Sequence, residues 1–412
     1  MVNYEPLVRE IQEILRFERD VVVSIILSAT GRITGIKVVF AAGNTLLKSL
    51  EYLGLYPPNN ARTSYYIYSF LLNVIVTVCY PITMTVDLFL LEDRSLLFRN
   101  ACVTFADAMS GVKSLNTFFK RKQLRRINNL LEHLDNRVKE VNDHDEQRYL
   151  ERIIRTANRI QFGYFIPFTA VAMTCFLPAI FSKQRRLIYS AWFPVDWKNS
   201  DTLYYIVIVY QLIGVWINIC QNMLSDSYPG LYLWILKGHF HALNIRVSKI
   251  GYDLRKTGED YYQELLKCIG DHKEILEYCR VFEETFSGVL FVQIFVTEVT
   301  LCITAAYIPY VDGMAEMIYT LVYFVCMATE ICLPCYCGNE IVYENAQFSN
   351  ALYSCNWIDQ DRKFKNALLF TMQRTQRPTI IYAGGIVMIS LSTLLTVFKS
   401  TYSLFTIVKQ TR

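Results

Sequence analysis

The sequence predicts an all-α membrane protein with seven transmembrane helices, and three observations lead to this prediction. The chain of 412 residues is 53 % hydrophobic and only 19 % charged, which is too apolar for an ordinary soluble protein of this length. Apolar runs of about 20 residues, the length that crosses roughly 30 Å of hydrocarbon, recur along it. Its basic residues are concentrated in alternate segments between these runs.

Seven apolar runs are the predicted spans. Two of them contain no charged residue and five contain one or two. The second is the weakest, because Asp107 and Lys113 interrupt it and hydropathy alone would miss it. The predicted spans are residues 65–91, 101–119, 162–181, 203–224, 287–310, 314–337 and 379–408.

The segment before the first span, residues 1–64, contains a short apolar run at 21–29. Acidic residues precede this run, and Gly31-Arg32 follows it without a clear small-residue cleavage site, so it does not resemble a signal peptide. Arg32 and Lys37 make an eighth span there unfavourable. We expect an amphipathic helix that lies on the membrane surface.

The placement of basic residues predicts the topology. The N-terminal segment and the loops after the second, fourth and sixth spans hold 31 Lys and Arg residues, whereas the opposite side holds nine. Short loops rich in Lys and Arg remain cytoplasmic. The N-terminus is therefore predicted inside and the C-terminus outside, although the longer loops on the first side account for part of the excess.

The cytoplasmic loops are predicted to be helical. After the second span, apolar residues recur three and four positions apart, which places them on one helix face: Leu124, Ile127, Leu131, Leu134, Val138 and Val141. The loop after the fourth span repeats the pattern, with Leu265, Leu266, Ile269, Ile275, Leu276, Cys279, Phe282 and Phe286. A third amphipathic stretch, 364–375, precedes the Arg377-Pro378 break.

These apolar stripes need a surface to pack against. They can pack against one another beneath the membrane or against a neighbouring subunit. We expect four regions: a cytoplasmic segment (1–64), the first six spans with their helical loops (65–337), a cytoplasmic anchor region (338–378), and the last span with a short extracellular tail (379–412).

No motif for catalysis, a cofactor or a metal was found. The chain has no glycine-rich phosphate loop, serine-triad elbow or HExxH motif. His239 and His241 are two positions apart and point to different helix faces. The cysteines at 332, 335 and 337 have no second ligand pair nearby, so we expect no zinc site. We expect neither an enzyme nor a nucleic-acid binder.

Among the carboxylic acids inside predicted spans, Asp107, Glu298 and Glu330 are candidates for a buried or functional role. Such groups face the bundle interior or water, because contact with lipid costs several kcal/mol. A proton-coupled transporter would use them, and so would a structural hydrogen-bond network. We favour the structural interpretation.

The last predicted span carries four hydroxyl groups on one helix face, at spacings of three, four and three: Thr393, Thr396, Ser400 and Ser403. Ser and Thr in membrane helices also bond to the preceding turn or let helices pack closely. We favour a water-facing stripe, because the same span tolerates Lys399, which we expect to extend to the outer rim.

Apolar and aromatic residues crowd the outer halves of the middle spans. They are equally compatible with lipid contact, with core packing, or with a pocket for volatile organic ligands. The candidate pocket residues are Phe105, Met109, Cys175, Phe176, Tyr205, Ile208, Leu212, Ile303, Tyr307, Tyr319 and Tyr323.

A series of short motifs runs from residue 333 to the end. They are Leu333-Pro334-Cys335-Tyr336-Cys337-Gly338-Asn339-Glu340, Asn350-Ala351-Leu352-Tyr353, Trp357, Gln373-Arg374-Thr375-Gln376-Arg377-Pro378, Ala383-Gly384-Gly385, Thr401-Tyr402-Ser403 and Phe405-Thr406. Together they resemble the C-terminal signature of the insect odorant receptors. The resemblance extends back to about residue 50, through Trp192-Phe193-Pro194-Val195-Asp196-Trp197 and Gln211. The first 50 residues match nothing in that pattern.

The resemblance implies an odorant-gated, non-selective cation channel in the plasma membrane of olfactory sensory neuron dendrites. It implies a heterotetramer with the odorant receptor co-receptor, joined through the cytoplasmic helices and surrounded by lipid. The last span would line the pore. An apolar gate near its outer end would fall at Leu404, Phe405 and Val408.

Three other classes are less compatible with the sequence. A G-protein-coupled receptor has its N-terminus outside, and no Asp-Arg-Tyr or Asn-Pro-x-x-Tyr motif is found at the expected ends of spans. A gustatory receptor of the same superfamily is disfavoured by the ending Thr401-Tyr402-Ser403-Leu404-Phe405-Thr406. A secondary transporter is expected to show an inverted repeat, and none was found.

Overall fold

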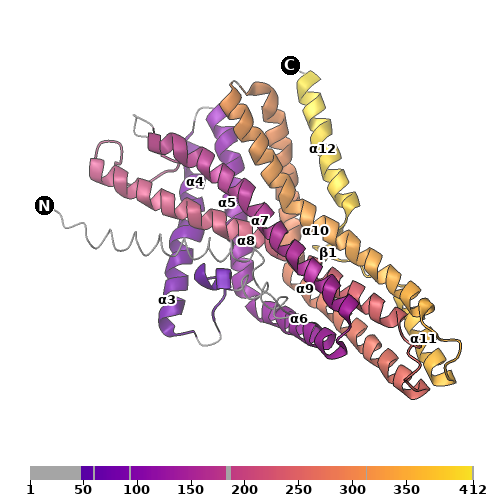
Figure 1. Ribbon diagram of the computed structural model, residues 1–412. Helices are drawn as coiled ribbons and strands as arrows, with labels where there is room; N and C mark the ends of the chain where they lie inside the picture. The colour runs from indigo at the N-terminus through magenta and orange to yellow at the C-terminus, as the bar shows by residue number, and fades with distance from the viewer. Residues whose placement is uncertain (1–47, 59–60, 92–93, 182–186, 312, 411–412) are drawn as a thin grey trace.

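The fold is described by a computed structural model of the chain, for residues 48–410 without 59–60, 92–93, 182–186 and 312. Helices dominate this part of the chain (Figure 1). They are α3 (Thr63–Leu72), the π-helical η1 (Asn73–Val78), α4 (Cys79–Leu90), α5 (Arg94–Phe119), α6 (Arg121–Val141), α7 (His144–Phe181), α8 (Asp201–Ser248), α9 (Gly258–Tyr307), the 3₁₀ turn η2 (Ile308–Tyr310), α10 (Met314–Ser354), α11 (Arg362–Thr375) and α12 (Leu391–Gln410). Two short strands, β1 (Tyr382–Ala383) and β2 (Val387–Met388), precede α12.

The predicted spans fall within these helices. Within the described residues, five helical segments are long and apolar enough to cross a membrane: Thr63–Leu90, α8, α9, Glu316–Ser354 of α10, and α12. The other two predicted spans lie in α5 and α7. Helix α5 has 26 residues and so is long enough to cross, although Asp107 and Lys113 lower its hydropathy.

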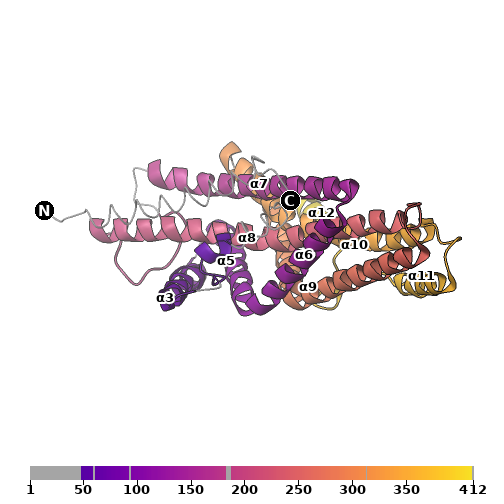
Figure 2. The same ribbon diagram turned by 60° about the horizontal axis from the view of Figure 1, so that its bottom comes forward.

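Helices α8, α9 and α10 extend well beyond the apolar runs that predicted them. With 48 residues, α8 is roughly 72 Å long at 1.5 Å per residue, more than twice the thickness of the hydrocarbon layer. In Figures 1 and 2, α9 and α10 continue past the apolar bundle and pack there with α6 and α11. The apolar bundle and these extensions share one continuous core.

The amphipathic stripes predicted for the loops are largely buried. On α6, the stripe residues are at most 6 % exposed, and α6 packs chiefly against α9: these residues are Leu124, Ile127, Leu131, Leu134 and Val138. Two members of the predicted stripes lie outside the core: Val141 at the end of α6 is 42 % exposed, and Leu266 on α9 is 39 % exposed. Val141 is displaced because the next residue, Asn142, turns the chain with φ 53°.

Local sequence signals set the helix ends in this region. Thr257 and Asp260 form a capping box at the start of α9, in which each side chain bonds to the other's backbone N–H. The Asp361 side chain accepts the backbone N–H of Phe364 and so caps α11.

The last helix begins later than the apolar run predicts. Residues 379–390 are not helical, and β1 and β2 pair as an antiparallel hairpin with Tyr382 opposite Met388. Gly384 and Gly385 have φ of 61° and 70°, which non-glycine residues rarely adopt, so they form the turn. The hairpin is bound to α9: the Ser287 hydroxyl donates to the Tyr382 carbonyl at 2.7 Å, and the Gly384 N–H donates to the Ser287 carbonyl at 2.9 Å.

Candidate functional site

The candidate site is a cavity of about 90 Å³ between the apolar helices. Side chains of α4, α5, α7, α8 and α10 line it, together with Tyr189 of the loop before α8. This volume is below the roughly 150 Å³ of an engineered cavity that holds benzene. The cavity in this conformation is therefore suited to compact ligands, or to larger ones that displace a side chain.

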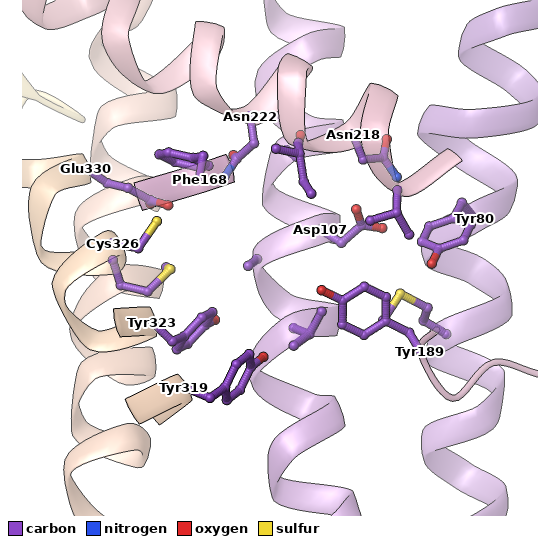
Figure 3. Close-up of a pocket in the computed structure, with 17 residues that line it drawn as sticks. Tyr80, Asp107, Phe168, Tyr189, Asn218, Asn222, Tyr319, Tyr323, Cys326 and Glu330 are labelled. Carbon is purple, nitrogen blue, oxygen red and sulfur yellow. The ribbon is translucent and has the colours of Figure 1, made fainter. Parts of the chain in front are cut away.

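Its lining is mostly aromatic and aliphatic, with a carboxyl group on each of two sides. Figure 3 shows Asp107 of α5 near Tyr80, Tyr189 and the amide of Asn218. Glu330 of α10 lies on the opposite side. The cavity is thus apolar in its walls and polar at its two ends.

The Glu330 end belongs to a buried polar network between four helices. Glu330 accepts a hydrogen bond from Gln293 of α9, whose neighbour Thr297 is 3.5 Å from the same carboxyl oxygen. Lys113 of α5 forms an ion pair with Asp226 of α8, and both side chains are at most 4 % exposed. Lys113 also donates to Asn222, which lines the cavity, at 2.8 Å. This network connects the cavity to α9.

The loop before α8 covers another part of the cavity. Gln211 of α8 accepts the backbone N–H of Ile188 and donates to the carbonyl of Tyr189, both at 3.0 Å. The Trp192 N–H donates to the Thr83 carbonyl of α4 at 3.1 Å. These bonds hold the Tyr189 ring against the cavity.

The candidate pocket residues occupy different positions. Tyr319 and Tyr323 line the cavity, Met109 is buried elsewhere in α5, and the side chains of Phe105 and Tyr205 are 51 % and 66 % exposed on the outer surface. Four further members are half-buried: Ile208, Leu212, Ile303 and Tyr307. Leu212 packs against the small core cluster of Tyr80 and Val215. The Tyr307 hydroxyl donates to Glu316 at 2.7 Å. Cys175 and Phe176 lie in α7, and their side chains are outside the described residues.

Several lining residues were not among the predicted pocket residues. Asp107 and Glu330 were predicted only as acids within spans. Asn218 and Asn222 were not considered, although their spacing of four places both on one face of α8. Polar residues at helical spacing inside an apolar run were the signal that could have identified this face of the cavity.

The predicted pore helix, α12, lies at the edge of the bundle and packs on α9 and α10 (Figure 1). Only 11 % of its apolar stretch is buried, the lowest share of the five apolar helices in the described chain. Thr393 and Thr396 donate to the carbonyls of Met388 and Ser392, at 2.6 and 2.9 Å. Ser400 donates to Glu298 of α9 at 2.7 Å.

The remaining predicted pore and gate residues lie in the final turns of α12. Ser403 is exposed, whereas Leu404, Phe405 and Val408 are half-buried. Lys399 is also exposed. In an isolated chain, α12 presents most of its surface, the hydroxyl groups at 396 and 403 included, to whatever surrounds the bundle.

The helical extensions are joined by ion pairs outside the apolar bundle. Arg246 of α8 contacts Glu146 of α7 at 2.6 Å and Asp271 of α9 at 2.5 Å. Burial raises the pKa of Glu146, and the neighbouring Arg246 opposes that rise. Burial also lowers the pKa of His272 on α9, which stacks on Phe348 of α10 with ring centroids 4.4 Å apart.

The chain is similar in sequence to a known protein family and to several of its members. The family model described as 7tm Odorant receptor matches residues 94–402. Odorant receptor 2a of Drosophila melanogaster is 33 % identical over 368 residues, which cover 85 % of this chain and 91 % of that receptor. Odorant receptor 59a of the same species is 30 % identical over 388 residues, covering 88 % and 95 %.

Solved structures show the same fold. The insect olfactory receptor OR5 from Machilis hrabei matches with a TM-score of 0.75 and 15 % identity, over 91 % of this chain and all of that chain. The same receptor in complex with eugenol matches with a TM-score of 0.69 and 14 % identity, over 92 % and 99 %.

Proposed function

The chain belongs to the 7tm odorant receptor family, and on this premise we propose that it is the ligand-binding subunit of an odorant-gated cation channel. A small volatile ligand occupies the cavity between α4, α5, α7, α8 and α10. Ligand binding changes the packing of α9 on α12, and α12 lines a conduction pathway that it shares with neighbouring subunits.

The observation that carries this proposal is the connection from the cavity to α12. Glu330 lines the cavity and bonds to Gln293 of α9. Five residues further along α9, Glu298 accepts the hydroxyl of Ser400 on α12. Helix α9 therefore contacts both a residue that lines the ligand cavity and the candidate pore helix, and a small shift of α9 would reach both.

We further propose that the chain assembles with the odorant receptor co-receptor, through the extensions of α6 to α11 on the cytoplasmic side. The excess of basic residues on that side supports an internal N-terminus and an external C-terminus. The exposed surface of α12 supports a role at a subunit interface or a pore, because an apolar helix with so little burial needs either lipid or a partner around it. Its place of action would be the dendritic membrane of olfactory sensory neurons. Eugenol in the related OR5 supports the expectation of small odorants.

The experiment that tests this function is an odorant panel on cells that express the chain with and without the co-receptor. We expect some odorants to evoke a non-selective cation current only when both proteins are present. Surface labelling of both proteins is the control, because it separates failed delivery from failed gating. Cells that show both proteins at the surface and no current with any odorant of a broad panel would contradict the proposal.

A further inference from the structure

Polar groups without partners gather at one end of the cavity. The Oδ2 atom of Asp107 and the hydroxyl of Ser110 are both shielded from solvent, and neither has a hydrogen-bond partner in the part of the chain that the structure describes. Both residues line the cavity. Ser110 is only 2 % exposed. A buried polar atom left unpaired is unfavourable, so these two atoms favour a ligand that pairs with them.

Asp107 also has no basic ion-pair partner among the described residues. Among the described residues, no Lys, Arg or His lies within ion-pair distance of its carboxyl group. Lys113, on the same helix, is paired with Asp226 and bonds to Asn222. Glu330, at the opposite end, is satisfied by Gln293. Of the two acids that line the cavity, Asp107 is the one with a shielded carboxyl oxygen, Oδ2, that has no partner among the described residues.

The side chains around Asp107 determine which ligand skeletons the cavity accommodates. Tyr80, Tyr189 and Tyr319 surround this end of the cavity with aromatic rings (Figure 3). Aromatic faces pack well against apolar groups and also attract positive charge. The small volume leaves room for a compact skeleton only.

On the premise of the proposed function, we propose that this cavity selects compact ligands that carry a hydrogen-bond donor, an alcohol or a primary amine, and that Asp107 accepts that donor. Esters, ethers and hydrocarbons of the same size leave the Asp107 oxygen unpaired in the bound state. A site that must hydrogen-bond its ligand discriminates strongly against analogues that lack the donor.

The test uses matched ligands on cells that express the intact complex of this chain with the co-receptor. One set is benzyl alcohol, benzylamine, anisole and ethylbenzene, and a second set is 1-pentanol, pentylamine, butyl methyl ether and n-hexane. Within each set the number of non-hydrogen atoms is constant. We expect the alcohol or the amine to activate at concentrations at least about tenfold lower than the ether and the hydrocarbon, which corresponds to about 1.4 kcal/mol.

Variants at Asp107 separate the two kinds of donor. Asp107→Asn retains an acceptor oxygen but cannot form an ion pair with an ammonium group, so it should weaken the response to the amine more than the response to the alcohol. Asp107→Leu removes the acceptor and should abolish the preference for alcohol over ether. The matched control is Asp87→Asn, the same chemical change on α4 at a residue that does not line the cavity, and it should leave the ligand preference unchanged.

The results that would refute the ligand preference differ from those that would refute the proposed function. Equal potency of donor and non-donor ligands, or activity of other odorants with none from either set, would overturn the inference while leaving the receptor function intact. A complex at the cell surface that responds to no odorant at all would remove the proposed function, and this inference with it. The ligand comparison on the unmutated complex needs no variant to fold.

Discussion

Lys113 is a buried cation, and its ion pair with Asp226 joins α5 to α8. Removing one member of a buried pair leaves the other charge unpaired, which costs about 3–5 kcal/mol. We therefore expect Lys113→Met to lower the thermal stability of the detergent-purified protein severely. Adding Asp226→Asn should recover a large part of the loss, because it removes the orphaned charge. Equal stability of the single and double variants would contradict a stabilising ion pair here.

His272 provides a pH-dependent prediction at the same scale. Burial lowers its pKa in the folded protein, whereas in the unfolded chain the pKa is near the ordinary value of about 6.5. The unfolded state therefore binds the proton more readily, and stability falls as the pH drops below about 6.5. The melting temperature of wild type should decrease between pH 7.5 and 5.5 by more than that of His272→Gln. A decrease of the same size in both proteins would show that other groups cause it.

Single residues also show where sequence reasoning reached the site and where it did not. Tyr319 and Tyr323 were predicted from their position in the outer half of a span, and both line the cavity. Phe105 was chosen by the same reasoning but faces outward. Lipid and a pocket both favour apolar side chains, so composition alone does not separate the two faces of a membrane helix. The acids and amides of the cavity carried that information instead.

At the scale of elements, the stripe on α6 is the clearest case in which periodicity predicted packing. Leu131 and Leu134 are 6 % and 3 % exposed, and an Asp at either position would bury an unpaired charge. The double variant Leu131→Asp/Leu134→Asp should lose surface expression and co-purification with the co-receptor. Val141→Asp is the matched control on the same helix, because Val141 is exposed, and it should assemble normally. Normal assembly of the double variant would show that the stripe is dispensable.

The hydroxyl stripe of α12 gives a second prediction at this scale. If the stripe faces water in the open channel, a charged thiol reagent applied with odorant should modify a cysteine at Thr396 and change the current. A cysteine at Leu395, about 100° around the helix, should react far less. Part of the effect depends on how many subunits carry the cysteine. Equal reaction at both positions, or none at either, would contradict a water-facing stripe.

The start of α12 could not be predicted from hydropathy. Residues 379–390 are apolar enough to extend the last span, yet they form the hairpin that Gly384 and Gly385 turn. Hydropathy measures burial and not backbone conformation, so the pair of glycines was the available signal. The continuity of α8, α9 and α10 past their apolar runs was likewise hidden, because a helix does not end where its apolar run ends.

At the scale of the whole molecule, the family and the helical architecture were predictable, while the arrangement of helices around the cavity was not. The C-terminal motifs led to the family that the comparisons show. The cavity requires contacts between α4, α5, α7, α8 and α10, which are far apart in the sequence. Such contacts depend on packing, and one sequence does not determine packing by inspection.

The topology stays a prediction. Epitope tags before Met1 and after Arg412 are to be stained on intact and on permeabilised cells. We expect the C-terminal tag to stain on intact cells and the N-terminal tag only after permeabilisation, because the basic segments lie on the side of the N-terminus. An N-terminal tag that stains on intact cells would invert the topology and favour a receptor of another class.

The central claim is that the protein is itself part of an ion channel that a small ligand opens. It is tested most directly by recording from membrane patches excised from cells that express this chain with the co-receptor, in solutions without GTP. The account predicts single-channel cation currents that begin on odorant application and persist after excision, with no currents in patches that lack this chain. Odorant currents that vanish on excision and return only when GTP is supplied would contradict it, because the conducting unit would then be a separate protein.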